Sequence, residues 1–163
     1  MSVASHQLQS NDVGDNNRYQ GPYVRIVEQP ARCALRFRYE CEGRSAGSIP
    51  GSSATPENKT YPTIHIQGYK GPAVVVVSCV TKDLPYRPHP HNLVGKDGCK
   101  KGVCTMRISN PEMICSFTSL GIQCVKRKDI EESLKLRETI QVDPFRSKLI
   151  IAAYISISLF EFL

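Results

Sequence analysis

Short β-prone runs separated by turn-forming residues recur along most of this 163-residue chain, and this pattern is the strongest constraint on its fold. The runs are rich in Val, Ile, Thr and Tyr, which are favoured in strands. Gly, Pro, Asn and Asp stand between them and mark turns. Many short strands with such separators are typical of two packed sheets, so we expect an all-β sandwich. The expected strands are residues 23–27, 34–40, 63–67, 73–81, 103–108 and 122–126.

One of these runs, Val74-Val75-Val76-Val77, is apolar on both faces rather than alternating with polar residues. A strand with one solvated face shows apolar and polar residues in turn. We therefore expect this strand to be central in its sheet and buried on each side.

One helix interrupts the β pattern, over residues 129–140. Asp129 is placed to cap its first turn, and Glu132 stands three positions later, as in a capping box. A broad, weakly amphipathic apolar face follows, and Asp143-Pro144 is expected to end the helical region.

Length and charge limit the possible function classes. The chain can form one domain with a modest core. Its net charge of +6 favours a polyanionic partner, although basic surfaces also serve solubility. Residues 1–20 are polar and lack the apolar core of a signal peptide, so we expect a disordered arm. The sequence has no P-loop, nucleophile elbow or zinc-protease motif, so we expect neither an enzyme nor a bound cofactor.

The cysteines are odd in number and irregularly spaced. Without a signal peptide, free thiols in a reducing compartment are the expected state. His89 and His91 together with Cys99 and Cys104 have the residue types of a zinc site, but not the spacing of a common zinc module. The favoured interpretation is a proline-stiffened loop whose histidines bond backbone groups, with no metal. The seven cysteines are Cys33, Cys41, Cys79, Cys99, Cys104, Cys115 and Cys124.

An apolar segment, residues 149–163, follows Arg146 and Lys148. It is shorter than the roughly 20 residues that a spanning helix needs, and Glu161 lies within it. We expect a buried strand or an unstructured tail. A membrane anchor is the alternative, because a basic flank before an apolar run has the shape of a tail anchor.

Arginines, carboxylates and a thiol are concentrated in residues 36–44, at the end of an expected strand and in the loop beyond it. An arginine fork can bond a guanine edge through two parallel hydrogen bonds, and a nearby carboxylate can accept from cytosine or align the fork. The stretch therefore fits a loop that reads DNA in the major groove. The alternative is a solvated edge strand with surface charge.

Two neighbouring features fit the same interpretation. The run Lys126-Arg127-Lys128 could neutralise phosphates without reading sequence, and its alternative is a solvated basic turn. Cys41 lies among arginines, and nearby positive charge favours the thiolate form. Such a thiol could bond a phosphate and lose that contact when oxidised. Glu40 and Glu42 oppose the arginines, so an inert loop residue is the alternative for Cys41.

The sequence around these residues resembles the DNA-recognition loop of Rel/NF-κB transcription factors, most closely the insect Dorsal-like members. The resemblance covers residues 21–145. The strings that carry it are Arg36-Phe37-Arg38-Tyr39, Cys41-Glu42-Gly43-Arg44-Ser45-Ala46-Gly47-Ser48-Ile49-Pro50-Gly51, Tyr61-Pro62-Thr63-Ile64, Val80-Thr81-Lys82-Asp83, residues 87–96 and residues 120–126.

The resemblance implies an immunoglobulin-like, p53-like β-sandwich with one helical insertion, and a role for each residue of the site. Arg36 and Arg38 would bond guanines of a G-rich κB half-site, and Glu42 would accept from cytosine and brace the arginines. Tyr39 would pack on sugar and base. The remaining roles are contacts with phosphates or with base and backbone, expected of Cys41, Arg44, Lys126 and Arg127.

The resemblance also implies partners and domain boundaries. We expect a disordered arm at 1–20, a DNA-binding domain at 21–145 that is incomplete at its C-terminal end, and an apolar tail at 146–163 outside the family. The partner would be double-stranded DNA, in cytoplasm and nucleus, with no membrane. A Rel-family dimer partner and an IκB-type inhibitor would bind a second sandwich that this sequence lacks. The alternative function is a truncated interaction product with little DNA binding.

Overall fold

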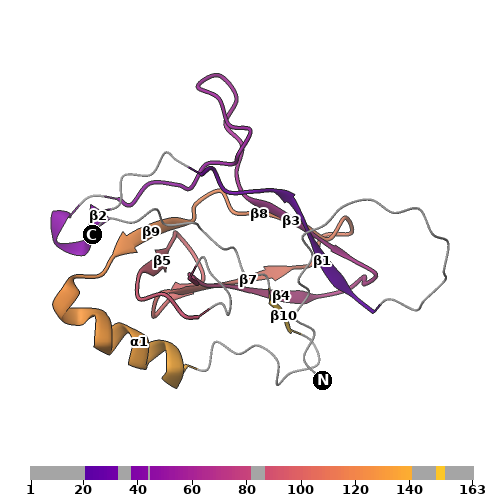
Figure 1. The fold of residues 1–163 in the computed structure, drawn as a ribbon. Helices are drawn as coiled ribbons and strands as arrows, with labels where there is room; N and C mark the ends of the chain where they lie inside the picture. The colour runs from indigo at the N-terminus through magenta and orange to yellow at the C-terminus, as the bar shows by residue number, and fades with distance from the viewer. Residues whose placement is uncertain (1–20, 33–37, 44, 82–86, 141–149, 153–163) are drawn as a thin grey trace.

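The computed structural model describes residues 21–32, 38–43, 45–81, 87–140 and 150–152. Within these ranges most regular structure is β-strand, and one α-helix lies at the edge of the sheets (Figure 1). The prediction of an all-β chain with one helical insertion is confirmed. The strands are β1 (Tyr23–Glu28), β2 (Arg38–Tyr39), β3 (Thr63–Gln67), β4 (Ala73–Val77), β5 (Asn92–Val94), β6 (Cys99–Lys100), β7 (Val103–Ile108), β8 (Ile114–Ser116), β9 (Gly121–Cys124) and β10 (Ile150–Ala152).

The described strands form three sheets, in the orders β1-β3-β8, β10-β4-β7-β6 and β2-β9-β5. Two 3₁₀ turns, η1 (Glu40–Glu42) and η2 (Arg127–Asp129), and the helix α1 (Ile130–Thr139) complete the regular structure. The three sheets share one core, because inward side chains of all three lie in a single buried cluster. That cluster includes Ile64 and Ile66 of β3, Val75 and Val77 of β4, and Leu93 and Ile122 of β5 and β9.

The strongly patterned strands were predicted best. Strands β3 and β7 have the predicted bounds, and β1 and β9 differ from prediction by one or two residues at their ends. Strand β4 ends at Val77, because Val80 bridges to Pro88 and the carbonyl of Cys79 accepts from the His89 amide, outside the sheet ladder. The expected strand at 34–40 is described as β2 alone, since residues 33–37 lie outside the described residues.

The valine run is interior to its sheet, as predicted, but the expected burial of both faces is wrong. Strand β4 lies between β10 and β7, and Val75 and Val77 are fully buried. Val74 and Val76 are only half-buried. Their partners on β7 are the polar residues Arg107 and Thr105, whereas their partners on β10 are Ile150 and Ala152, so this face of the strand is not part of the buried core.

The helix lies within the predicted range, but the predicted capping box is wrong. Asp129 makes no side-chain capping bond. It belongs instead to η2, where its amide donates to the carbonyl of Lys126 at 2.9 Å. The 3₁₀ turn thus supplies the first backbone bond that a capping side chain would otherwise provide. Asp143-Pro144 lies outside the described residues.

The buried residues of α1 are polar and bond the helix to the sandwich, while Ile130, Leu134 and Leu136 are half-buried. Ser133 and Arg137 are its buried residues, one turn apart on the same face. The Ser133 hydroxyl donates to the carbonyl of Pro90 at 2.6 Å. The Arg137 guanidinium donates to Asn92 Oδ1 at 2.5 Å and to the carbonyl of His91 at 3.2 Å. We call Ser133, Arg137, His91 and Asn92 the polar anchor of α1.

Both histidines of the loop before β5 accept backbone hydrogen bonds. The amide of His91 donates to His89 Nδ1 at 3.2 Å, and the amide of Val125 donates to His91 Nδ1 at 3.3 Å. The interpretation of a proline-stiffened loop with backbone-bonded histidines is confirmed. Burial lowers the pKa of His89 to about 4, and the charges of His91 and Arg137 add to this effect. Burial also lowers the pKa of His91.

The expectation of free thiols is wrong for one pair. Cys99 and Cys104 face each other across the antiparallel pair β6–β7 and form a disulfide bond. Bonded sulfurs are not available as thiolate ligands, and no group of potential metal ligands occurs among the described residues. Cys41, Cys79, Cys115 and Cys124 are free thiols.

Part of the apolar segment forms a strand. Residues Ile150–Ala152 pair in parallel with Val74–Val76 of β4, so β10 covers one edge of this sheet. A strand was one of the two expected forms, and residues 153–163 lie outside the described residues. In the part of the chain that the structure describes, no helix has both the length and the apolar character of a membrane span.

The histidine geometry predicts that the fold loses stability as the pH falls below about 6.5. His89 is neutral in the folded state with a pKa of about 4, whereas in the unfolded chain it takes up a proton near its ordinary value of 6.5. The stabilisation is therefore complete above about pH 6.5 and is lost between there and about pH 4. Thermal melts followed by circular dichroism from about pH 7 to about pH 5 measure this slope.

His89→Gln is the matched variant, because it removes the titrating group but keeps a polar side chain. We expect its melting temperature to vary less over this range than that of the wild type. An identical pH dependence in the two proteins would contradict the assignment.

Candidate nucleic-acid interface

The candidate site is assembled by the pairing of two segments far apart in the sequence. Strand β2 runs parallel to β9, with Arg38 opposite Gln123 and Tyr39 opposite Cys124. Because the strands are parallel, the chain leaves both at the same edge of the sheet. There η1 follows β2, and η2 follows β9 after two residues. The two turns therefore emerge side by side, at the left of the view in Figure 1.

Within the first turn, Glu42 organises its neighbours. Arg38 Nη1 lies 3.0 Å from Glu42 Oε2, and the Tyr39 amide donates to Glu42 Oε1 at 3.1 Å. One carboxylate thus fixes both a guanidinium and the backbone at the start of η1. Gly43 closes the turn with φ of +62°, a left-handed conformation that favours glycine, and its amide donates to the carbonyl of Glu40. The predicted contact between Glu42 and an arginine is confirmed for Arg38.

The side chains that could meet a ligand point into solvent. Tyr39 is 43% exposed. Glu40, Cys41 and Glu42 are exposed, and Arg38 is half-buried against the sheet. A guanidinium held by a carboxylate on one side keeps further N–H groups for a ligand. Arg36 and Arg44, the other two arginines of the prediction, lie outside the described residues.

The loop that follows the turn is fixed to the sandwich at residues 46–53. Ile49 is fully buried, and its amide donates to the carbonyl of Leu120 at 2.7 Å. A Cβ on Gly121 would lie 2.3 Å from the carbonyl oxygen of Gly47, so the loop lies directly on the start of β9. Glu28 accepts from the amide and hydroxyl of Ser53, both at 2.7 Å, and these bonds lower the pKa of its carboxyl group.

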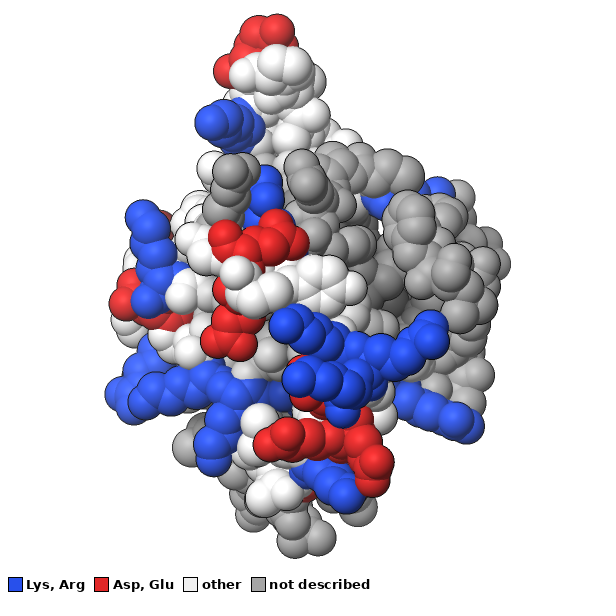
Figure 2. All heavy atoms as spheres, turned by 90° about the vertical axis from the view of Figure 1, so that its left-hand side faces the viewer, with Lys and Arg blue, Asp and Glu red and all other residues white. Residues whose placement is uncertain are grey.

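The second turn carries the predicted basic run. Lys126, Arg127 and Lys128 are all exposed. Burial raises the pKa of Cys124, the last residue of β9, and the charge of the nearby Glu42 adds to this effect. Lys and Arg side chains form a broad band across the lower half of this face, with Asp and Glu groups above and below it (Figure 2). This face therefore carries charges of both signs, with the Lys and Arg side chains gathered in one band.

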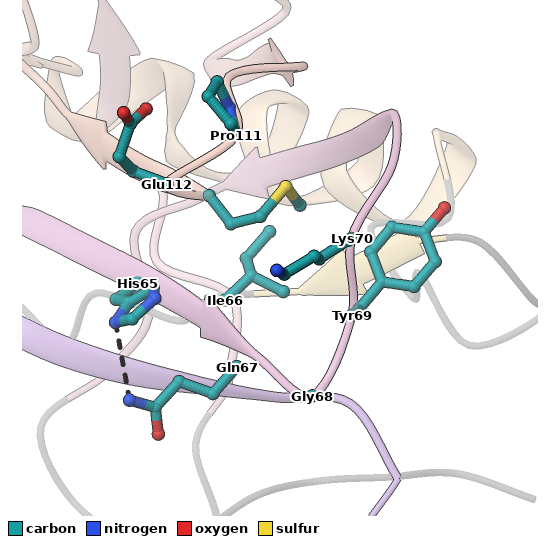
Figure 3. A pocket seen from close by; sticks show the side chains of 9 residues that line it. His65, Ile66, Gln67, Gly68, Tyr69, Lys70, Pro111 and Glu112 are labelled. Atoms are coloured by element: carbon teal, nitrogen blue, oxygen red, sulfur yellow. Dashed lines mark hydrogen bonds between the residues drawn. The ribbon is translucent and has the colours of Figure 1, made fainter.

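A hollow lies away from these turns, beside the β3–β4 turn on the right-hand side of the view in Figure 1. It has a volume of about 390 Å³ and lies between the β3–β4 turn and the residues before β8. Figure 3 shows His65 and Gln67 on one side, joined through Nδ1 and Nε2 at 3.4 Å, with Tyr69 on the opposite side and the Lys70 side chain pointing between them toward Ile66. None of the predicted site residues lines it.

Sequence reasoning missed the buried polar residues that bond α1 to the sandwich next to this interface, above all Arg137. Arginine is mostly exposed in proteins, yet Arg137 is 2% exposed. The available signal was weak. Ser133 and Arg137 lie at helical spacing among the apolar residues Ile130, Leu134 and Ile140, which indicates an inward face, and Gly102 is the glycine against which the guanidinium packs.

Comparison with known proteins identifies the family. The model of the Rel homology DNA-binding domain matches residues 24–153, past the expected boundary at 145 and through β10. The chain therefore belongs to the Rel homology DNA-binding domain family, as the resemblance implied, and this is a family of DNA-binding domains rather than of enzymes.

Relatives agree with this assignment. The chain is 68% identical over 145 residues to the embryonic polarity protein dorsal of Drosophila melanogaster. The match covers 89% of this chain and 14% of that protein. It is 51% identical over 124 residues to the proto-oncogene c-Rel of Meleagris gallopavo, covering 76% of this chain and 23% of that protein. The chain thus spans less than a quarter of the length of either relative.

A solved structure, the Dorsal homologue Gambif1 bound to DNA, superposes with a TM-score of 0.72 at 66% identity. The match covers 77% of this chain and 73% of that one. The fold class, an immunoglobulin-like sandwich of the p53-like type with one helical insertion, is thereby confirmed.

The burial of the free cysteines predicts their order of reaction with iodoacetamide. Cys41 is exposed in η1 and should be alkylated first. Cys79 is buried in the core, and burial raises its pKa to about 12, so it should react last and only as the protein opens. A time course of peptide mass spectrometry under native conditions measures this order.

Denaturant is the control, since it should make the two cysteines react at similar rates. Equal rates for Cys41 and Cys79 in the native protein would contradict the described placement of η1 and of the segment that follows β4.

Proposed function

We propose that this chain is a sequence-specific DNA-binding domain of a Rel/NF-κB transcription factor, which reads a G-rich κB half-site in the major groove through residues 36–44. The observation that carries the proposal is the parallel pairing of β2 with β9. It places the Arg38–Glu42 pair, which suits base edges, beside the exposed cations of residues 126–128, which suit phosphates. The DNA-bound Dorsal homologue supports it as a relative of the same fold.

The base-reading roles rest on residues at the end of β2. Arg38 would bond a guanine through two parallel hydrogen bonds, with Arg36 beside it as a second guanine contact. Glu42 would hold Arg38 in line and accept from a cytosine amino group. Tyr39, exposed on the same turn, would pack on sugar and base.

The remaining roles are contacts with the DNA backbone and its surroundings. Lys126 and Arg127 would neutralise phosphates, and Arg44 would add a base or backbone contact. Cys41 would touch a phosphate as a thiol and lose that contact on oxidation, which makes it the redox-sensitive position. We propose the cytoplasm and nucleus as locations and double-stranded DNA as the partner. A Rel-family dimer partner and an IκB-type inhibitor are not assigned to this surface.

We favour DNA binding over the alternative of an interaction product without it. The turn η1, which we propose reads bases, is held in place by Glu42, which bonds both Arg38 and the Tyr39 amide. The family match also spans both paired segments.

The direct test is fluorescence anisotropy with a G-rich κB duplex and a scrambled duplex of equal length and composition. We expect the wild type to prefer the κB duplex, and equal affinities would refute specific binding. Arg38→Ala should weaken κB binding by about 1–3 kcal/mol, roughly 5- to 150-fold, with less effect on the scrambled duplex. A uniform loss on both duplexes would make Arg38 a phosphate contact instead.

The basic turn should behave differently from Arg38. Arg127→Ala should weaken binding to both duplexes by similar factors and reduce the slope of log K against log salt by about one unit. Lys70→Ala, at the hollow away from the two turns, is the control for loss of one positive charge. An Arg127 variant with an unchanged salt slope would show that this residue does not contact phosphate.

A further inference from the structure

The guanidinium of Arg137 is a buried cation that joins three segments of the chain. It donates from Nη2 to Asn92 Oδ1 at 2.5 Å and to the carbonyl of His91 at 3.2 Å. It donates from Nη1 to the carbonyl of Lys101, in the turn between β6 and β7. Because the residue is 2% exposed, it cannot itself touch a DNA phosphate.

The β6–β7 turn lies against this guanidinium. Lys101, whose carbonyl accepts from Arg137, holds φ of 53°, as the first central residue of a two-residue hairpin does in a type I′ turn. The next residue, Gly102, has φ of +79°, and a Cβ there would lie 1.9 Å from Arg137 Nη2 and 2.3 Å from Asn92 Oδ1. The lack of a side chain at Gly102 therefore lets the guanidinium lie directly against the turn.

Attaching a helix through a buried guanidinium costs more free energy than attaching it through an apolar side chain. A buried charge loses its hydration, and within the part of the chain that the structure describes Arg137 forms no ion pair with a carboxylate. An apolar residue would bind α1 to the sandwich without this loss. The hydrogen bonds differ from apolar contacts in being directional, so they fix the rotation and axial position of α1.

The anchor fixes the basic turn from both of its ends. On one side, α1 begins at Ile130, directly after η2, so the helix held by Arg137 fixes where Arg127 and Lys128 leave the sheet. On the other side, His91 gives its carbonyl to Arg137 and accepts the Val125 amide through Nδ1 at 3.3 Å. Val125 directly precedes Lys126.

We propose that Arg137 is a positioning residue for phosphate binding, which holds Lys126 and Arg127 in register with the DNA backbone through α1 and His91. The inference rests on the proposed function, since it assigns phosphate contacts to residues 126 and 127. Arg137 acts only through these residues. Its removal should therefore reduce phosphate contacts and leave the discrimination by Arg38 unchanged.

The test is Arg137→Met, which keeps the length and apolar stem of the side chain and removes its donors. With a κB duplex over a range of NaCl concentrations, we expect affinity to fall about tenfold at moderate salt and the slope of log K against log salt to fall by one to two units. The ratio of affinities for κB and scrambled duplexes should stay that of the wild type. Arg137→Lys, which keeps a charge and can still donate to one carbonyl, should recover part of the slope.

Lys135→Met is the matched control, because Lys135 lies on the same helix, has a side chain 70% exposed, and loses the same charge. Its salt slope should change less than that of Arg137→Met. Stoichiometric titration gives the active fraction of each variant, so that slopes are compared for folded protein. An active Arg137→Met protein with a wild-type salt slope would overturn the proposal and leave Arg137 as a structural residue.

Asn92→Ala is the variant to measure if Arg137→Met does not fold. It removes one acceptor of the guanidinium, and the carbonyls of His91 and Lys101 remain as acceptors. It should reduce the salt slope in the same direction, and an unchanged slope would count against the proposal. Failure of the proposed function gives a different result, namely equal wild-type affinities for κB and scrambled duplexes. The slope comparison can still be made on the scrambled duplex alone, so the two failures are distinguishable.

Discussion

The short parallel ladder between β2 and β9 is the contact on which the interface depends. It joins residues some 85 positions apart through the pairs Arg38–Gln123 and Tyr39–Cys124. Because the two strands run parallel, both segments of the chain leave the sheet at the same end. The turn that we propose reads bases and the basic turn therefore emerge together. Because neighbouring residues of a strand point to opposite faces, a register shift of one residue would turn Arg38 and Tyr39 to the opposite faces of the sheet. The register therefore decides how both side chains are presented to a ligand.

A ladder of two residue pairs is too short to hold this register alone, and the rest of the fold stabilises its partner strand. Strand β9 also pairs with β5, and Ile122 and Leu93 of these strands lie in the core. The loop after η1 returns to the same strand, where the Ile49 amide bonds the carbonyl of Leu120 and Gly121 allows the close approach of Gly47. Strand β9 is thus a fixed reference against which both turns are placed.

How far the sequence predicts this arrangement depends on the range of each interaction. Strands β3 and β7 were predictable because their alternation is local, whereas β5, β6 and β8 have two or three residues each and no period to detect. The Arg38–Glu42 contact joins residues four apart and was predicted, with its role in base reading still a prediction. The Cys99–Cys104 bond and the burial of Arg137 arise from a hairpin turn and a helix that meet only after folding. A pattern of local charge and hydrophobicity therefore gives only a weak sign that Arg137 is buried.

The same reasoning explains why a polar anchor suits the helix beside a phosphate-binding turn. Apolar side chains attach a helix but tolerate small rotations and shifts, since their contacts are not directional. A shift of about one ångström at α1 would move the adjacent cations by a similar distance, enough to break hydrogen bonds with a phosphate oxygen. The guanidinium of Arg137, bonded to Asn92, His91 and Lys101, allows few such movements. The desolvation cost of burying it is reasonable where position matters more than stability, and in this fold position matters at the ends of β2 and β9.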